Sequence, residues 1–120
     1  MSQQVEVFQG KNVTLELVVH EPKRTLTFDS GRVEYGIETT IEVYATKYDE
    51  KKRVYLTEVK EYRRENVYFA DELDAEKVEN EFGAKLNKTL EELRKALSHI
   101  VELSKRVDKV EILEEAEEDC

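Results

Sequence analysis

The chain has 120 residues, 39% charged and 39% hydrophobic, a length typical of a single domain. Its formal net charge of −9, from 19 basic and 28 acidic residues, argues against a general coat for duplex DNA and against a polybasic membrane anchor. No apolar run reaches the roughly 18 residues of a membrane span and residues 1–10 lack the regions of a signal peptide, so we expect a cytoplasmic protein without membrane contact.

The first part of the chain shows the two-residue apolar period of half-buried strands. Two alternating runs, at residues 5–7 and 13–19, predict a hairpin. Pro22 then interrupts the pattern, because proline has no N–H group for a sheet ladder. A third strand, around residues 26–28, ends in a turn where Gly31 provides the positive φ that such turns need.

The most regular alternation lies in residues 33–46 and predicts a central strand with one buried face. Gly36 inside it is a candidate for a bend or bulge. A fifth strand is expected over residues 53–62, and residues 67–69 offer a short sixth. Together these runs predict an antiparallel β-meander of five to six strands in a β domain of residues 1–70.

The pairing of the last two long strands is predicted from charge. If Val43 pairs with Val59, Glu42 lies opposite Lys60, and opposite charges across two strands contribute roughly 0.2–1 kcal/mol. A slide of two residues would instead place Glu42 opposite Glu58. We therefore expect the first register.

From Asp71 onward the apolar period becomes helical, which predicts an α+β fold with one long C-terminal coiled-coil helix over residues 71–109. Asp71 is the expected N-cap. At 1.5 Å per residue this helix would be about 58 Å long. Residues 110–120 form an acidic tail that we expect to be solvated, with a short strand at 110–112 as an alternative for its first part.

Apolar residues recur along this helix at spacings of four and three, as in the seam of a coiled coil. The members of this seam are Leu86, Leu90, Leu93, Leu97, Ile100 and Val107, with Ser104 as the one polar position. A small β domain would cover only the first turns, and each leucine left in water forgoes roughly 1.5–3 kcal/mol. The seam therefore predicts a homodimer, the alternative being that it packs on the protein's own sheet.

The residues that acid/base, metal or phosphate chemistry requires are sparse. His20 and His99 are far apart in the chain, and neither has a second histidine or a cysteine at ligand spacing. The single cysteine, Cys120, excludes an internal disulfide, and none of the four glycines belongs to a phosphate-binding loop. We therefore expect no enzymatic activity, no cofactor and no metal site.

The stretch from residue 47 to residue 69 mixes cations with tyrosines. This mixture is typical of proteins that bind single-stranded nucleic acid, where cations follow the phosphates and aromatic rings stack on unpaired bases. The predicted binding residues are Lys51, Lys52, Arg53, Tyr55, Lys60, Tyr62, Arg63 and Arg64. The alternative is that the cations pair with glutamates and that the tyrosines are ordinary strand residues.

This layout, a small antiparallel sheet with a Tyr/Arg-rich strand pair and a leucine-zipper helix, resembles that of the archaeal ThermoDBP group of single-stranded DNA-binding proteins. The resemblance is one of plan over most of the chain and assigns no individual binding residue. It implies a nucleic-acid-binding domain with an aromatic-bearing cleft and a C-terminal dimerising zipper. The abundance of Glu and Lys and the scarcity of Gln, Met and Cys are in the direction of thermophile proteins.

The sequence thus predicts a non-enzymatic homodimer that binds single-stranded DNA or RNA on its sheet. The second hypothesis is a dimeric structural or adaptor protein whose sheet binds another protein and never contacts nucleic acid.

Overall fold

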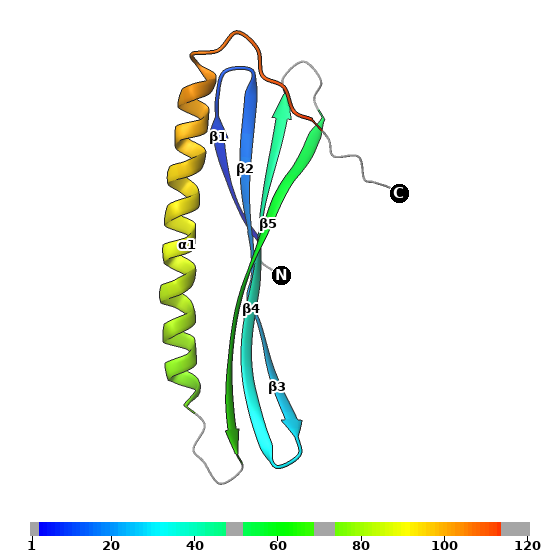
Figure 1. Cartoon of the computed structure of the whole chain (residues 1–120), viewed down its shortest axis with the longest axis vertical. Helices are drawn as coiled ribbons and strands as arrows, with labels where there is room; N and C mark the ends of the chain where they lie inside the picture. Colours follow the sequence, from blue (N-terminus) through cyan, green and yellow to red (C-terminus); the bar gives the residue numbers. More distant parts are fainter. Residues whose placement is uncertain (1–2, 48–51, 69–73, 114–120) are drawn as a thin grey trace.

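In the computed structural model, which describes residues 3–47, 52–68 and 74–113, one long helix lies along one face of a five-stranded antiparallel sheet (Figure 1). The molecule is elongated, with extents of 63 × 34 × 22 Å. The predicted α+β class is therefore confirmed. In chain order the elements are β1 (Gln3–Gln9), β2 (Val13–His20), β3 (Lys23–Asp29), β4 (Arg32–Lys47), β5 (Arg53–Tyr68) and α1 (Ala75–Ser104).

The strand β4 organises the sheet. Along one edge it pairs with β5 over nearly its whole length, and along the other edge it pairs first with β3 and then with β2. β2 and β3 thus lie end to end, separated by the break that contains Pro22. β1 extends the sheet beyond β2. The strand order therefore departs from that of a simple meander, because β2 and β3 share one neighbour.

The tight turn between β3 and β4 is formed by two residues, Ser30 and Gly31, with φ of 41° and 83°. Positive φ at both central positions is what a two-residue hairpin turn of type I′ requires. The positive φ that the sequence predicts at Gly31 is thus confirmed. The predicted hairpin of residues 5–19 is also present, as β1 and β2.

The register predicted for β4 and β5 is wrong. Ile41 pairs with Val59, and Glu42 lies opposite Glu58. A slide of two residues leaves every side chain on the same face of a sheet, so both registers bury the same apolar groups. Repulsion between exposed charges is too small to decide between them, and Glu42 has a further partner in His20.

The irregularity expected at Gly36 is also displaced. Gly36 pairs regularly with Arg64, while the register of β4 against β5 shifts between Val43 and Tyr44. β5 continues through Tyr68, so no separate sixth strand forms from residues 67–68, and Phe69 lies outside the described residues.

The helix is shorter than predicted at both ends. Asp74 is the N-cap, and its carboxylate accepts a hydrogen bond from the backbone N–H of Lys77 at 3.1 Å, whereas Asp71 lies outside the described residues. At the other end the helix stops at Ser104 instead of residue 109. Its 30 residues correspond to about 45 Å.

Most of the leucine seam packs on the protein's own sheet. Leu90 and Leu97 are 8% and 4% exposed in a core shared with β2 and β4, and Leu86 and Leu93 pack against the same core. The expectation that the sheet covers only the first helical turns is wrong because β4 and β5 have 16 residues each, about 53 Å. These four leucines therefore give no reason to expect a second chain.

The last two seam residues are different. Ile100 and Val107 are 45% and 42% exposed, and Leu103 beside them is 42% exposed. After the helix, residues 105–113 cross the end of the sheet (Figure 1), where Val110 and Ile112 pack against the main core. They form no strand, and residues 114–120 of the predicted acidic tail lie outside the described residues.

Candidate nucleic-acid interface

The sheet has one face toward α1 and one face on which none of the other described elements packs. Ile41 and Val43 of β4 belong to the core beneath α1. Successive side chains of a strand point to opposite faces, so Glu42 and Tyr44 point away from α1. Residues that are paired across strands share a face. We call this second surface the open face.

Five of the eight predicted binding residues lie on the open face. They are paired with, or alternate with, residues of β4 that point away from the helix. These five are Arg53, Tyr55, Lys60, Tyr62 and Arg64. Both tyrosines are 47% exposed. The predicted mixture of cations and aromatic rings is therefore gathered on one side of the sheet.

The other three predicted residues are placed differently. Arg63 points toward α1, where its guanidinium pairs with Glu81. Lys52 is exposed and precedes β5, and Lys51 lies outside the described residues. Because side chains alternate along a strand, two adjacent arginines cannot both face the same ligand.

One end of the open face holds a cluster of stacked side chains. The rings of Tyr44 and Tyr55 meet edge to face with centroids 5.4 Å apart, and the Arg53 guanidinium lies 3.5 Å from the centre of the Tyr44 ring. Arg53 also donates to Glu16 through Nε at 2.7 Å. Tyr44 was not among the predicted residues, because its position opposite Tyr55 follows from the register and not from sequence spacing.

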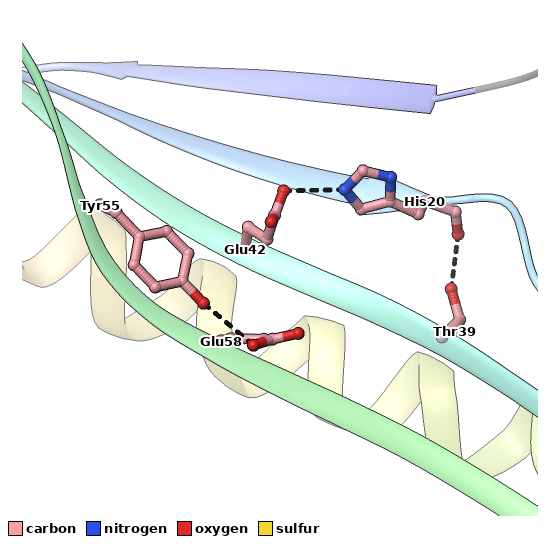
Figure 2. Close-up of polar contacts among 5 residues, drawn as sticks. All are labelled: His20, Thr39, Glu42, Tyr55 and Glu58. Atoms are coloured by element: carbon pink, nitrogen blue, oxygen red, sulfur yellow. Dashed lines mark hydrogen bonds and ion pairs between the residues drawn. The ribbon is translucent and has the colours of Figure 1, made fainter.

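The middle of the open face is an acidic hollow of about 300 Å³, and Figure 2 labels His20, Thr39, Glu42 and Glu58 from its lining. Its lining comes from the end of β2, from β4 and from β5. The lining residues are His20, Glu21, Lys23, Glu38, Thr39, Thr40, Glu42 and Glu58. Among the described residues no three His, Cys, Asp or Glu side chains converge as metal ligands.

Two hydrogen bonds hold the carboxylates of this hollow (Figure 2). Nε2 of His20 lies 2.7 Å from Oε1 of Glu42, and the hydroxyl of Tyr55 donates to Oε1 of Glu58 at 3.1 Å. The His20 contact lowers the pKa of Glu42. Partial burial, and then the Glu58 carboxylate, raise the pKa of Tyr55. Both carboxylates are therefore held in place although they oppose each other across the strands.

A second hollow, of about 240 Å³, lies farther along the open face, over Gly36. It differs from the first in having two cations and an aromatic ring in its wall. Its lining residues are Lys23, Thr25, Thr27, Gly36, Ile37, Glu38, Tyr62 and Arg64. The guanidinium of Arg64 lies 5.2 Å from the centre of the Tyr62 ring and pairs with Glu34. The sequence pattern does not reveal the β3 residues of this hollow, because only the sheet topology places them on the same face as the β5 residues, on the other side of β4.

The cations of the open face are therefore partly neutralised. Arg53 pairs with Glu16 and Arg64 with Glu34, while Lys60 forms no ion pair within the described parts of the chain. The Arg53–Glu16 pair lies near the surface and contributes about 0–1 kcal/mol, so a phosphate group can compete with Glu16 for Arg53. Glu34 is only 9% exposed, so Arg64 keeps this partner and can contact a phosphate through the N–H groups that Glu34 does not use.

No protein-family model, no curated protein and no solved structure matches the chain. Among the described residues, no helix combines the length and the apolar character needed to cross a membrane.

Proposed function

We propose that this protein is a non-catalytic binder of single-stranded nucleic acid and that the open face is its binding surface. The observation that carries the proposal is that Tyr55 and Tyr62, each 47% exposed, share this face with Arg53, Lys60 and Arg64. An exposed ring can stack on an unpaired base, and the cations beside it can follow the phosphates.

The carboxylates in the middle of the face set the expected strength of binding. Glu42 and Glu58 repel a phosphate backbone, so the strand is expected to make its main contacts at the two ends of the face, near Tyr55 and near Tyr62. Binding should weaken steeply with added salt, because each phosphate that a lysine or arginine neutralises releases counterions from the nucleic acid.

A protein partner is the second candidate, and the balance of charge favours it. Among the described residues of β2 to β5, the open face carries six acidic residues against five cations. The acidic residues are Glu16, Asp29, Glu34, Glu38, Glu42 and Glu58, and the cations are Lys23, Arg32, Arg53, Lys60 and Arg64. Tyrosine and arginine are also enriched in protein interfaces. A partner that fits this surface would present a basic side chain to the acidic hollow.

One substitution separates the two candidates by the sign of its effect. Glu58→Gln removes a negative charge from the open face, so it should tighten the binding of a labelled single-stranded oligonucleotide roughly twofold to fivefold. The same change should weaken the binding of a labelled arginine-rich peptide. Glu91→Gln, on an exposed position of α1, removes the same charge elsewhere and is the matched control. Both titrations are followed by fluorescence anisotropy at several salt concentrations.

The tyrosines give a second test of the same proposal. Each stacked base contributes about 1–3 kcal/mol, so Tyr55→Ala combined with Tyr62→Ala should weaken oligonucleotide binding at least tenfold. The corresponding phenylalanine substitutions keep the rings and should keep most of the binding. If the wild-type protein does not bind the oligonucleotide even at low salt, the nucleic-acid proposal is wrong, and peptide binding then identifies the second candidate.

A further inference from the structure

Gly36 lies in the middle of the long central strand β4, where a glycine lowers the stability of the sheet. Glycine loses more conformational freedom on folding than other residues and offers no side chain to pack. The backbone here does not require it: the φ of Gly36 is not positive, and its pairing with Arg64 is regular.

Packing alone does not require glycine at this position either. A Cβ atom built there would lie 3.3 Å from Oγ1 of Thr25 and 3.6 Å from the carbonyl oxygen of Arg63. The first contact is tight, but a hydroxyl can rotate away, and the second is an ordinary one. Because residue 36 has no side chain, its backbone forms the floor of the 240 Å³ hollow on the open face. Glycine within a strand often marks a place where a ligand approaches the backbone closely.

The walls of this hollow carry the groups that recognise a nucleotide. Tyr62 on β5 offers its ring, and Arg64 beside it offers a guanidinium plane, both of which stack on bases. On the β3 side, Lys23 forms no ion pair within the described residues and provides a cation for phosphate. Next to it, the hydroxyl groups of Thr25 and Thr27 both donate and accept hydrogen bonds.

Glu38 is the one carboxylate in the lining. It pairs directly across the strands with Tyr62, so its side chain neighbours that of Tyr62 on the open face. A carboxylate in that place accepts a hydrogen bond from the exocyclic amino group of a base, as glutamate does with cytosine.

We infer that the hollow over Gly36 is a nucleotide subsite, in which one unpaired base stacks on Tyr62 while Lys23 and Arg64 hold its phosphate. This inference rests on the proposed function and adds to it a defined position on the open face. It also assigns a binding role to β3, which the sequence pattern did not connect with β5.

The test fills the hollow without changing charge. Gly36→Val places a side chain on the floor of the hollow, and valine suits a strand position. It should raise the Kd for a labelled mixed-sequence single-stranded oligonucleotide about tenfold, because one base stack is lost. Gly83→Ala is the matched control, because a Cβ atom at Gly83 has no neighbour within 4 Å, and it should leave the Kd unchanged. Circular dichroism shows whether each variant is folded.

Two further variants apply if Gly36→Val does not fold. Thr25→Val keeps the shape of the side chain and removes its hydroxyl, so it should weaken oligonucleotide binding. Lys23→Gln should lower the salt dependence of binding by about one phosphate contact. If the wild type binds the oligonucleotide and these folded variants bind it equally well, the subsite is wrong while the proposed function stands. If the wild type does not bind, the proposed function itself is overturned.

Discussion

Single contacts at the ends of α1 fix how the helix lies on the sheet. At its C-terminal end, the hydroxyl of Ser104 accepts a hydrogen bond from the backbone N–H of Lys11 at 3.0 Å and donates one to the carbonyl oxygen of Val101 at 2.6 Å. Ser104 is thus the link between the helix and the turn that joins β1 to β2. Its polarity, unusual in an apolar seam, has this structural reason.

This contact depends on Gly10. A Cβ atom at Gly10 would lie 2.7 Å from the hydroxyl oxygen of Ser104 and 3.0 Å from the carbonyl oxygen of Val13. We expect Gly10→Ala to lower the free energy of unfolding by about 1–3 kcal/mol, as overpacking does in a filled core. Urea denaturation measures the change. Gly83→Ala should be neutral or stabilising, and equal effects of the two substitutions would contradict the contact.

Near the N-terminal end of α1, Glu79 joins the helix to two strands. Its carboxylate accepts two hydrogen bonds from the Arg24 guanidinium of β3, at 2.7 and 3.0 Å, and one from the Tyr35 hydroxyl of β4. The Arg24 contact, followed by that of Tyr35, lowers the pKa of Glu79 from 4.5 to about 2. The same carboxylate raises the pKa of Tyr35.

This shift predicts a defined acid sensitivity. A carboxyl group whose pKa is lower in the folded state stabilises the fold above its ordinary pKa. Its contribution is lost as the pH falls from 4.5 toward about 2. We expect Glu79→Gln to reduce the stability at neutral pH and to flatten the loss of stability across this window, measured by thermal melts at a series of pH values. Glu92→Gln, at an exposed helix position, should keep the slope of the wild type.

At the scale of the elements, the helix presents two apolar stripes with different roles. Leu90, Leu97 and Val101 are buried against β2 and β4. Ile100 and Leu103 face solvent. Both stripes follow from the same spacing of three and four residues, so periodicity alone does not tell which stripe meets the sheet.

The two stripes should respond differently to truncation. Leu97→Ala removes a side chain that is 4% exposed and should cost about 2–5 kcal/mol of unfolding free energy. Ile100→Ala, at a position 45% exposed, should change stability by less than about 0.5 kcal/mol. Thermal and urea unfolding of the two variants give the comparison. A large loss for Ile100→Ala would mean that this residue is covered in solution.

At the scale of the whole molecule, the long sheet and the helix match in length. The 16-residue strands extend about 53 Å and the 30-residue helix about 45 Å, which produces the elongated shape in Figure 1. A long row of leucines is therefore covered without a second subunit. The homodimer stays a prediction, and the seam residues left for it are Ile100 and Val107.

Light scattering tests this remaining prediction. If the homodimer uses the exposed end of the seam, the wild type has the mass of two chains and Ile100→Glu has the mass of one, with an unchanged circular dichroism spectrum. Leu97→Glu should instead unfold the chain, because it places a charge in the monomer's own core. A monomeric wild type would contradict the homodimer. Each particle would then present one open face, and binding would gain nothing from a second face on a partner chain.

The sequence by itself determined the features that depend on neighbouring residues. These features are the alternation in residues 33–46, the break at Pro22, the turn at Gly31 and the helical period from Asp71 onward. Each follows from local sterics and from burial of one face. For the same reason, the alternation of Arg63 and Arg64 already implied that they point to opposite faces, although both were predicted as binding residues.

Only the tertiary structure decided what depends on pairing between distant segments. Three features are of this kind. They are the register that sets Glu42 against Glu58, the placement of Lys23 and Thr25 in one hollow with Tyr62 across β4, and the packing of the leucine seam on β2 and β4. The physical reason is a near equality of energies. Sliding a strand by two residues keeps each side chain on its face, and a leucine gains as much from its own sheet as from another chain, so the length and arrangement of the whole sheet make the choice.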